Sequence, residues 1–140
     1  MKVAIVLFLA FFSAFIHADP LPSTTLQAGM YQIRAEIASN NASREVGLMY
    51  RTYLPSDDGM LFIFENKAGH CFWMRNTKIP LSIAFIADDG KILNIEDMQA
   101  MTENNHCPVA PIRYALEMNQ GWFSKKGIST GFVINGLPRR

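Results

Sequence analysis

The sequence contains few of the residues that most often mark an active or metal-binding site. It has only two cysteines and three histidines in 140 residues. It has no Cys-x-x-Cys or His-x-x-x-His spacing and no His-Glu-x-x-His motif. A glycine-rich dinucleotide or phosphate loop is also absent. These absences remove the common zinc and nucleotide-binding signatures from consideration.

An excess of charge of one sign is also missing. The formal net charge is +1, and the charges balance once residues 1–18 are set aside, because Lys2 is the only charged residue there. The basic pairs Lys125–Lys126 and Arg139–Arg140 are short, as expected of solvated ends. A balanced chain lacks the electrostatic footprint of a nucleic-acid binder, so we predict no nucleic-acid partner.

Long apolar runs are confined to the first residues. Lys2 is followed by an apolar run at 3–16, and a cleavage site is available after Ala18. The run spans 14 residues, fewer than the roughly 20 that cross a bilayer core. We predict a cleaved signal peptide over residues 1–18, no lipid anchor, and a periplasmic or secreted protein without a stable membrane span. An uncleaved amphipathic or membrane anchor is the alternative.

The two cysteines, Cys71 and Cys107, are a disulfide candidate in an oxidising compartment. A bridge would close a loop of 37 residues and contribute roughly 4 kcal/mol in the chain-entropy model. The alternative is two unpaired thiols, with Cys71 a small core residue and Cys107 in a loop. The sequence leaves both open, because it does not supply the Cβ geometry that a disulfide requires.

Short segments of alternating or continuous apolar residues dominate the rest of the chain. The segment at 60–65 is nearly continuous in apolar residues, which predicts a strand covered on both faces. The turn Asp88-Asp89-Gly90 predicts a hairpin between its two neighbours. Strands are predicted at 30–38, 60–65, through Cys71, 81–87, 91–97, 112–118 and 130–135.

Little helix is predicted between these strands. Residues 40–43 can cap a short helix at 44–50, with Val46 and Met49 facing inward. Residues 121–127 allow no more than one helical turn. The expected organisation is a flexible lead-in at 19–29 and a single domain at 30–140, built as a β sandwich or squat barrel with one or two short helices. A long irregular loop is expected at 98–111.

Four segments together resemble a known family. They are Gly47-Leu48-Met49-Tyr50-Arg51, Gly59-Met60-Leu61-Phe62-Ile63-Phe64, Phe72-Trp73-Met74-Arg75-Asn76-Thr77 with Pro80-Leu81, and Tyr114-Ala115-Leu116-Glu117 with Gly121-Trp122 and Gly127. The chain resembles the domain of unknown function family one hundred and ninety-two over most of its length after the leader. The resemblance implies a compact, jelly-roll-like β fold and frequent export. It implies no reaction, because none is established for the family.

The chain departs from the family pattern at two positions. Ser82 stands where the family usually has aspartate after Pro-Leu, and Phe132 follows Gly131 where Gly-Asp is common. Any metal or acid–base role of those aspartates in relatives would be missing here.

The segment that begins at Cys71 provides the candidate ligand-binding residues. On a strand, Trp73 and Arg75 share one face, opposite the core pair Phe72 and Met74. The indole can stack on a ring of a ligand, and the neighbouring guanidinium can form two parallel hydrogen bonds with a carboxylate or phosphate. We therefore take Trp73, Arg75, Asn76 and, if it lies nearby, Arg51 as ligand-binding candidates. The structural alternative buries Trp73 in a core gap, pairs Arg75 with a carboxylate such as Glu117 and uses Asn76-Thr77 to organise the turn before Pro80.

Two chemical alternatives rest on fewer residues. Copper(I) could be held by the soft or borderline ligands Met98, Met101, His106 and Cys107, but no metal-binding spacing supports this, and a disulfide would remove Cys107. For hydrolysis, the adjacent acids Asp57-Asp58 fit a turn better than a catalytic pair, and His70 and Cys71 would point to opposite faces of a strand.

The sequence thus predicts an exported, non-enzymatic β domain that binds a small ligand or an envelope protein, with no catalytic residues, resident metal or cofactor assigned. An enzyme acting on envelope carbohydrate or peptide is the alternative, and copper handling is the third.

Overall fold

The structure of the protein, a computed structural model, describes residues 19–139. The predicted signal peptide at 1–18 lies outside the described residues. None of the helices formed by residues 19–139 is long and apolar enough to cross a bilayer. The elements are β1 (Ser23–Ala28), β2 (Tyr31–Ala38), α1 (Asn41–Val46), β3 (Asp58–Ala68), β4 (Leu81–Ile86), β5 (Ile92–Met98), β6 (Ile112–Asn119), α2 (Trp122–Lys125) and β7 (Ile134–Asn135).

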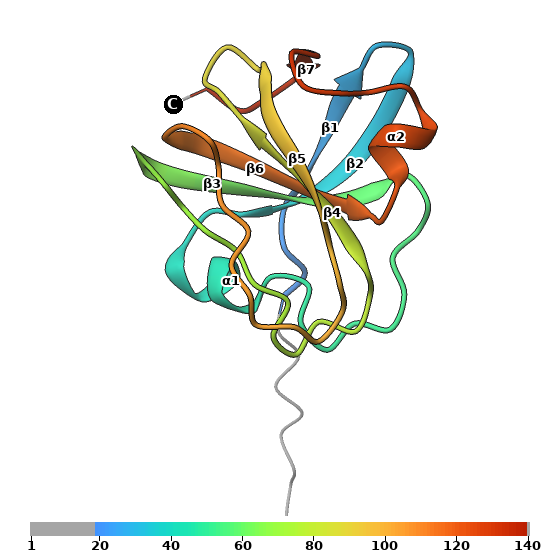
Figure 1. The fold of residues 1–140 in the computed structure, drawn as a ribbon, viewed down its shortest axis with the longest axis vertical. Coiled ribbons are helices and arrows are strands. Elements are labelled where there is room, and N and C mark those ends of the chain that lie inside the picture. Colours follow the sequence, from blue (N-terminus) through green and yellow to red (C-terminus); the bar gives the residue numbers. More distant parts are fainter. Residues whose placement is uncertain (1–18, 140) are drawn as a thin grey trace, which may run out of the picture.

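The seven strands form one sheet in the order β5-β4-β6-β3-β2-β1-β7. All neighbouring strands are antiparallel except β2 and β3, which run parallel and are joined through α1. The sheet curls into a half barrel, with α1 and α2 on different sides of it (Figure 1). Strand accounts for 43% and helix for 8% of the chain, so the predicted mainly-β fold with short helices is confirmed.

The sheet is buried on both faces, which explains the continuous apolar runs. Every residue of β4 is buried, and β3 is buried over Gly59–Ile63, as the pattern at 60–65 predicted. One core packs against α2 and includes Trp122 and Phe123. The second core packs against the residues after α1 and the segment 71–79, and it contains Leu48, Met74 and Ile79. The second core forms the base of the candidate site described below.

Local sequence signals account for the turns and caps. The Asp88-Asp89-Gly90 turn joins β4 and β5 as an antiparallel hairpin, as predicted. Asn40 caps α1 in a capping box with Ser43, so the helix begins three residues earlier than expected and ends at Val46. Val46 is consequently exposed, and the inward-facing residue is Leu48 rather than Val46.

Three other predicted elements differ in the structure. The lead-in expected to be flexible contains β1, which pairs with β2 and β7 and buries Leu26 and Ala28. The strand expected at 130–135 is reduced to Ile134–Asn135. The segment from Cys71 is extended but is not a regular strand; its only ladder contact is an isolated bridge between Phe72 and His106. In each case the deciding factor is whether a partner strand lies alongside.

Gly59 allows β3 to approach β6 closely. A Cβ atom at this position would lie 2.5 Å from the carbonyl oxygen of Glu117 and 2.4 Å from the sulfur of Met118. Only glycine fits this contact, which fixes the pairing of β3 with β6 beside the carboxyl group considered next.

Candidate functional site

A pocket of about 540 Å³ lies between α1, strand β3 and the extended segment 71–77. We call it the α1 pocket. Its walls are residues 44–50, Phe62, Phe64, residues 71–73 and 75–77, and Glu117. The lining is largely aromatic and apolar, with a few polar groups, which is the usual composition of a small-molecule site.

The wall at 71–77 alternates as the sequence predicted, although it is not a regular strand. Met74 is fully buried and Phe72 is half-buried against Phe62, whereas Trp73 and Arg75 are exposed. The segment is held by backbone bonds rather than by a ladder. Phe72 exchanges two 2.8 Å bonds with His106, and the Met74 N–H donates to the Thr102 carbonyl at 2.9 Å.

A disulfide between Cys71 and Cys107 fastens the same wall. The sequence left this pairing open between a bridge and two free thiols, and the structure pairs them. The bridge joins the segment 71–77 to the loop between β5 and β6. One edge of the α1 pocket is therefore covalently tied to a loop more than thirty residues away in sequence.

The opposite edge is closed by a contact between Tyr50 and Asn76. Both residues have positive φ angles, 66° and 54°. This conformation is a strong outlier for a tyrosine and acceptable for an asparagine. The Tyr50 N–H donates to the Asn76 carbonyl at 2.9 Å, and the Asn76 Nδ2 donates to the Tyr50 hydroxyl at 3.1 Å. These bonds connect the turn after α1 to the segment 71–77 and fix the positions of the two pocket walls relative to each other.

The most unusual group in the pocket is the carboxyl of Glu117. This residue lies on β6, paired with Met60 on one side and Ile83 on the other. It is 5% exposed, and its side chain has no hydrogen bond or ion pair to any described residue. Burial raises its pKa from the ordinary 4.5 to about 8. An unpaired carboxyl in apolar surroundings stays protonated at neutral pH and can both donate and accept a hydrogen bond.

The sequence placed Glu117 in a family segment and offered it as one example of a carboxylate that could pair with Arg75; the structure does not form this pair. Arg75 instead lies 3.5 Å from Glu103, and both side chains are largely exposed. Its guanidinium also lies 5.4 Å from the ring of Trp73. The signal that could have identified Glu117 was its place between Leu116 and Met118, inside a strand whose other central residues are apolar.

Three of the four ligand-binding candidates come together at this pocket. Trp73, Arg75 and Asn76 all line it. Trp73 is 44% exposed, so it does not plug a core gap. Asn76 bonds to Tyr50 rather than to its own turn, where Thr77 donates to the Arg75 carbonyl instead.

Comparison with known proteins places the chain in a family. The family model named DUF192 and described as an uncharacterized ACR matches residues 24–136. The chain belongs to the DUF192 family. The resemblance found in the sequence is thereby confirmed, and the absence of an established activity for this family applies to the chain.

Two solved structures are similar to this DUF192 protein. A candidate transcription regulator from Sinorhizobium meliloti 1021 is 32% identical, with a TM-score of 0.80, covering 86% of this chain and 98% of its own. A protein of unknown function from Novosphingobium aromaticivorans DSM 12444 is 30% identical, with a TM-score of 0.79, covering 85% and 94%. No curated protein matches the chain.

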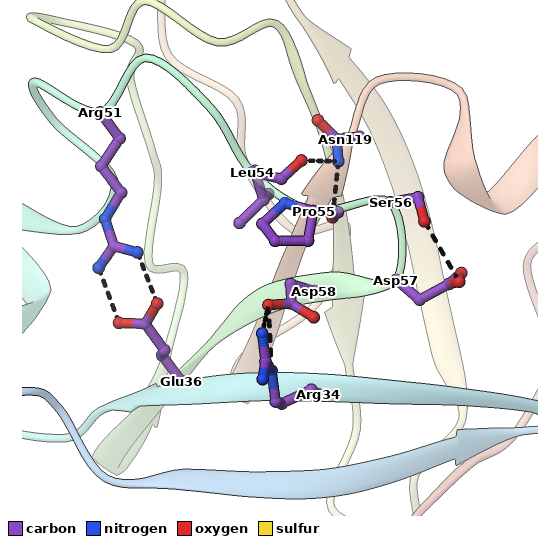
Figure 2. A network of polar contacts seen from close by, with 9 residues as sticks. All are labelled: Arg34, Glu36, Arg51, Leu54, Pro55, Ser56, Asp57, Asp58 and Asn119. Atoms are coloured by element: carbon purple, nitrogen blue, oxygen red, sulfur yellow. Dashed lines mark hydrogen bonds and ion pairs between the residues drawn. The ribbon is translucent and has the colours of Figure 1, made fainter.

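The fourth ligand-binding candidate, Arg51, does not line the α1 pocket of this DUF192 chain. It forms a two-pronged ion pair with Glu36 of β2, with N–O distances of 2.5 and 2.7 Å (Figure 2). This hydrogen bonding raises the pKa of Arg51 above its ordinary value. The pair borders a separate groove with Arg34 and Asp58, which also pair with each other (Figure 2). Arg51 therefore anchors the turn after α1 to β2.

The four copper candidates of the DUF192 chain are not arranged as a soft-ligand site. Met98 is fully buried in the second core, whereas Met101 is exposed. The His106 Nδ1 lies 2.7 Å from a Glu96 carboxylate oxygen. Cys107 is in the disulfide and has no thiolate to offer. Within residues 19–139 no cluster of three His, Cys, Asp or Glu side chains is placed to hold a metal ion.

The acids and the histidine considered for hydrolysis have structural partners instead. Asp57 accepts a hydrogen bond from the Trp122 indole at 2.9 Å, which lowers the pKa of Asp57 below its ordinary value. Asp58 pairs with Arg34. His70 stacks on Phe64 with ring centres 3.6 Å apart. These contacts agree with the preference for a turn at Asp57–Asp58.

The departures from the DUF192 pattern also have visible local roles. The Ser82 hydroxyl donates to the Asp97 carboxylate and accepts from the Gly121 N–H at 2.9 Å. It links β4 to β5 and to the start of α2. Phe132 packs against the core that α2 covers. At these two positions the chain uses a hydroxyl for bonding and a ring for packing.

Proposed function

We propose that this protein is an exported binding module whose α1 pocket takes a small organic ligand. The observation that carries this proposal is the unpartnered carboxyl of Glu117, which lines an otherwise largely aromatic pocket. Glu117 is only 5% exposed, yet no side-chain nitrogen or oxygen of the described residues is both fully buried and unpartnered, so the carboxyl of Glu117 opens onto the pocket. A ligand with a hydrogen-bonding group would therefore find this carboxyl accessible and free of a protein partner.

The rim of the pocket supports the same proposal. Trp73 offers a ring face, and Arg75 offers a guanidinium that is held only loosely by the exposed Glu103. Large exposed aromatic and apolar side chains, Tyr50 and Val46, stand on the other wall. A ligand with a ring or apolar stem and a polar end fits this distribution: its body would contact the aromatic walls and its outer end would reach Arg75.

Export is part of the proposal and rests on two independent features. The leader at 1–18 has the composition of a cleaved signal peptide. The Cys71–Cys107 disulfide is of the kind that persists in oxidising compartments. Both favour a periplasmic or secreted location, and the balanced charge of the chain favours a small ligand over nucleic acid.

An enzyme acting on envelope carbohydrate or peptide is the second candidate. Burial tunes the Glu117 carboxyl toward neutral pH, the range in which a general acid or base works well. Such chemistry also needs a second positioned group. The other carboxylate of the pocket belongs to Glu45, which is exposed on α1. Binding accounts for the geometry with the groups present and is therefore the preferred function.

Native mass spectrometry of the protein purified from an exporting host tests the proposal first. The denatured mass reports removal of residues 1–18 and loss of two thiol hydrogens. An extra mass that disappears on denaturation identifies a retained ligand. The variant Arg75→Ala should retain less of it, whereas Arg34→Ala, which breaks an ion pair with Asp58 outside the pocket, should retain as much as the original chain.

The two tryptophans allow a second test that needs no retained ligand. The Trp73 indole lines the α1 pocket, whereas the Trp122 indole is bonded to Asp57 in another part of the molecule. Small ring-bearing amines, alcohols and carboxylates should shift the Trp73 indole resonance and leave that of Trp122 in place. A bare native mass together with an unmoved Trp73 resonance would refute the binding function.

A further inference from the structure

We infer that the α1 pocket selects organic cations, in particular a primary amine carried on an apolar or aromatic stem, with Glu117 as the group that receives the ammonium. The inference rests on the proposed binding function and adds the chemical class of the ligand. It is carried by one unpaired carboxyl in a pocket lined by aromatic rings, where neither arginine of the pocket, Arg44 or Arg75, pairs with that carboxyl.

The carboxyl of Glu117 lacks a positive partner from the protein. The charged groups of the pocket are Arg44 and Glu45 on α1 and Arg75 on the segment 71–77. The Arg44 guanidinium donates to the carbonyls of Ser39 and Ile63 at 2.7 and 2.8 Å, and to the Asn41 side chain at 2.6 Å. Arg75 is directed to Glu103 and Trp73. The place of a counter-cation beside Glu117 is therefore left to a ligand.

The rings around this carboxyl also favour a cation. Phe62 and Phe72 line the pocket and meet edge to face with centres 4.9 Å apart. Phe64 and Trp73 line it too, but Phe64 already contacts the Arg44 guanidinium and the His70 ring, and Trp73 contacts the Arg75 guanidinium. The face of an aromatic ring attracts an ammonium, whereas it repels a carboxylate. The same rings provide apolar contact for the stem. An anionic ligand would be repelled by these ring faces.

The free energy of binding to the α1 pocket should differ between an amine and a neutral alcohol of the same shape. Folding has already buried most of the Glu117 side chain, so binding adds little further desolvation of this residue. An ammonium that reaches it gains a charge-assisted hydrogen bond, roughly twice as strong as a neutral one. An alcohol gains only the neutral bond, so the amine should bind at least about tenfold more tightly once the carboxyl is ionised, at pH values above about 8.

Binding of an amine should also release a proton. Below about pH 8 the carboxyl of Glu117 is protonated in the free protein. When an ammonium binds, the carboxyl loses its proton to solvent, and the pair of opposite charges remains in the pocket. Affinity for the amine should therefore rise with pH up to about 8, while affinity for the alcohol should stay flat or fall over the same range.

Calorimetric titration with three probes of one shape tests this inference: 2-phenylethylamine, 2-phenylethanol and phenylacetate, with the intact domain near pH 6.5. Repeating the amine titration in two buffers of different ionisation enthalpy counts the protons released. The expected result is close to one proton released per amine near pH 6.5, and amine binding at least about tenfold tighter than alcohol binding when the titrations are repeated above about pH 8. The variant Glu117→Gln should lower the affinity for the amine by about the same factor that separates amine from alcohol in the original chain. It should also abolish the proton release and leave the affinity for the alcohol unchanged.

The outcomes also separate the inference from the proposed function. If the alcohol or phenylacetate shifts the Trp73 resonance and binds as tightly as the amine, the pocket is a binding site but not a cation site. Amine binding without proton release would also overturn the role of Glu117, and this measurement needs no variant. If no probe shifts Trp73, the binding function fails together with the inference.

Discussion

The buried carboxyl of Glu117 should make the stability of this protein depend on pH in a direction that is unusual for an acid. Folding raises the pKa of this group from 4.5 to about 8. Between these values the folded chain holds a proton that the unfolded chain has released. The free energy of unfolding should therefore fall as the pH rises through this window, and Glu117 should contribute no pH dependence below it or above it.

The size of the effect follows from the pKa shift. One pKa unit corresponds to about 1.36 kcal/mol, so the shift of Glu117 corresponds to about 5 kcal/mol lost between about pH 4.5 and about pH 8. This is a large fraction of the stability of a small domain. The variant Glu117→Gln keeps the shape of the side chain and removes the titration, so its stability should be nearly flat over the same range.

Urea unfolding at several pH values between about 5 and 9 measures this difference. Glu45→Gln is the matched control, because Glu45 is an exposed carboxylate of the same pocket. In this variant the free energy of unfolding should fall with pH as steeply as in the original chain. Asp57, whose pKa is lowered by its bond to Trp122, affects stability only under more acidic conditions, where its contribution is lost as the pH falls. Parallel pH profiles for the original chain and Glu117→Gln would refute the argument.

Three further predictions concern the groups around the pocket. Replacing both Cys71 and Cys107 by serine should lower the free energy of unfolding by roughly 4 kcal/mol and the melting temperature by about 15 °C; an unchanged melting temperature in the absence of reductant would contradict the contribution of the bridge. Arg51→Ala should cost about 1 kcal/mol in urea unfolding, because it breaks a half-exposed two-pronged pair with Glu36; a free energy of unfolding equal to that of the original chain would contradict the anchoring role of Arg51. Arg75→Ala should reduce the ligand retained in native mass spectrometry while moving the melting temperature by less than about 2 °C, since its ion pair is exposed; a large loss of stability would instead assign Arg75 a structural role.

The local sequence pattern predicted the fold class and the alternation of the pocket wall. Period-two alternation sets which side chains of an extended segment face the core, even where no ladder forms. Met74 is accordingly buried, while Trp73 and Arg75 are exposed. The Asp88-Asp89-Gly90 hairpin followed in the same way from turn chemistry that needs no distant partner.

The prediction failed where the outcome depends on a distant segment. β1 was missed because its apolar residues become a strand only when β2 and β7 lie on either side. Arg51 was grouped with Trp73, yet it pairs with Glu36 across a separate groove. Neither result can be read from local periodicity, because strand order and crossover geometry decide which segments meet.

The sequence by itself determined that this is a β-rich DUF192 protein, and it determined which residues of the segment 71–77 face inward. Only the tertiary structure decided that Glu117 lies unpaired in a pocket, that Tyr50 and Asn76 close one edge of it and that the disulfide ties the other. The physical reason is that burial and side-chain direction follow from short-range backbone geometry. The absence of a partner for a carboxyl, in contrast, depends on every segment that the fold places around it.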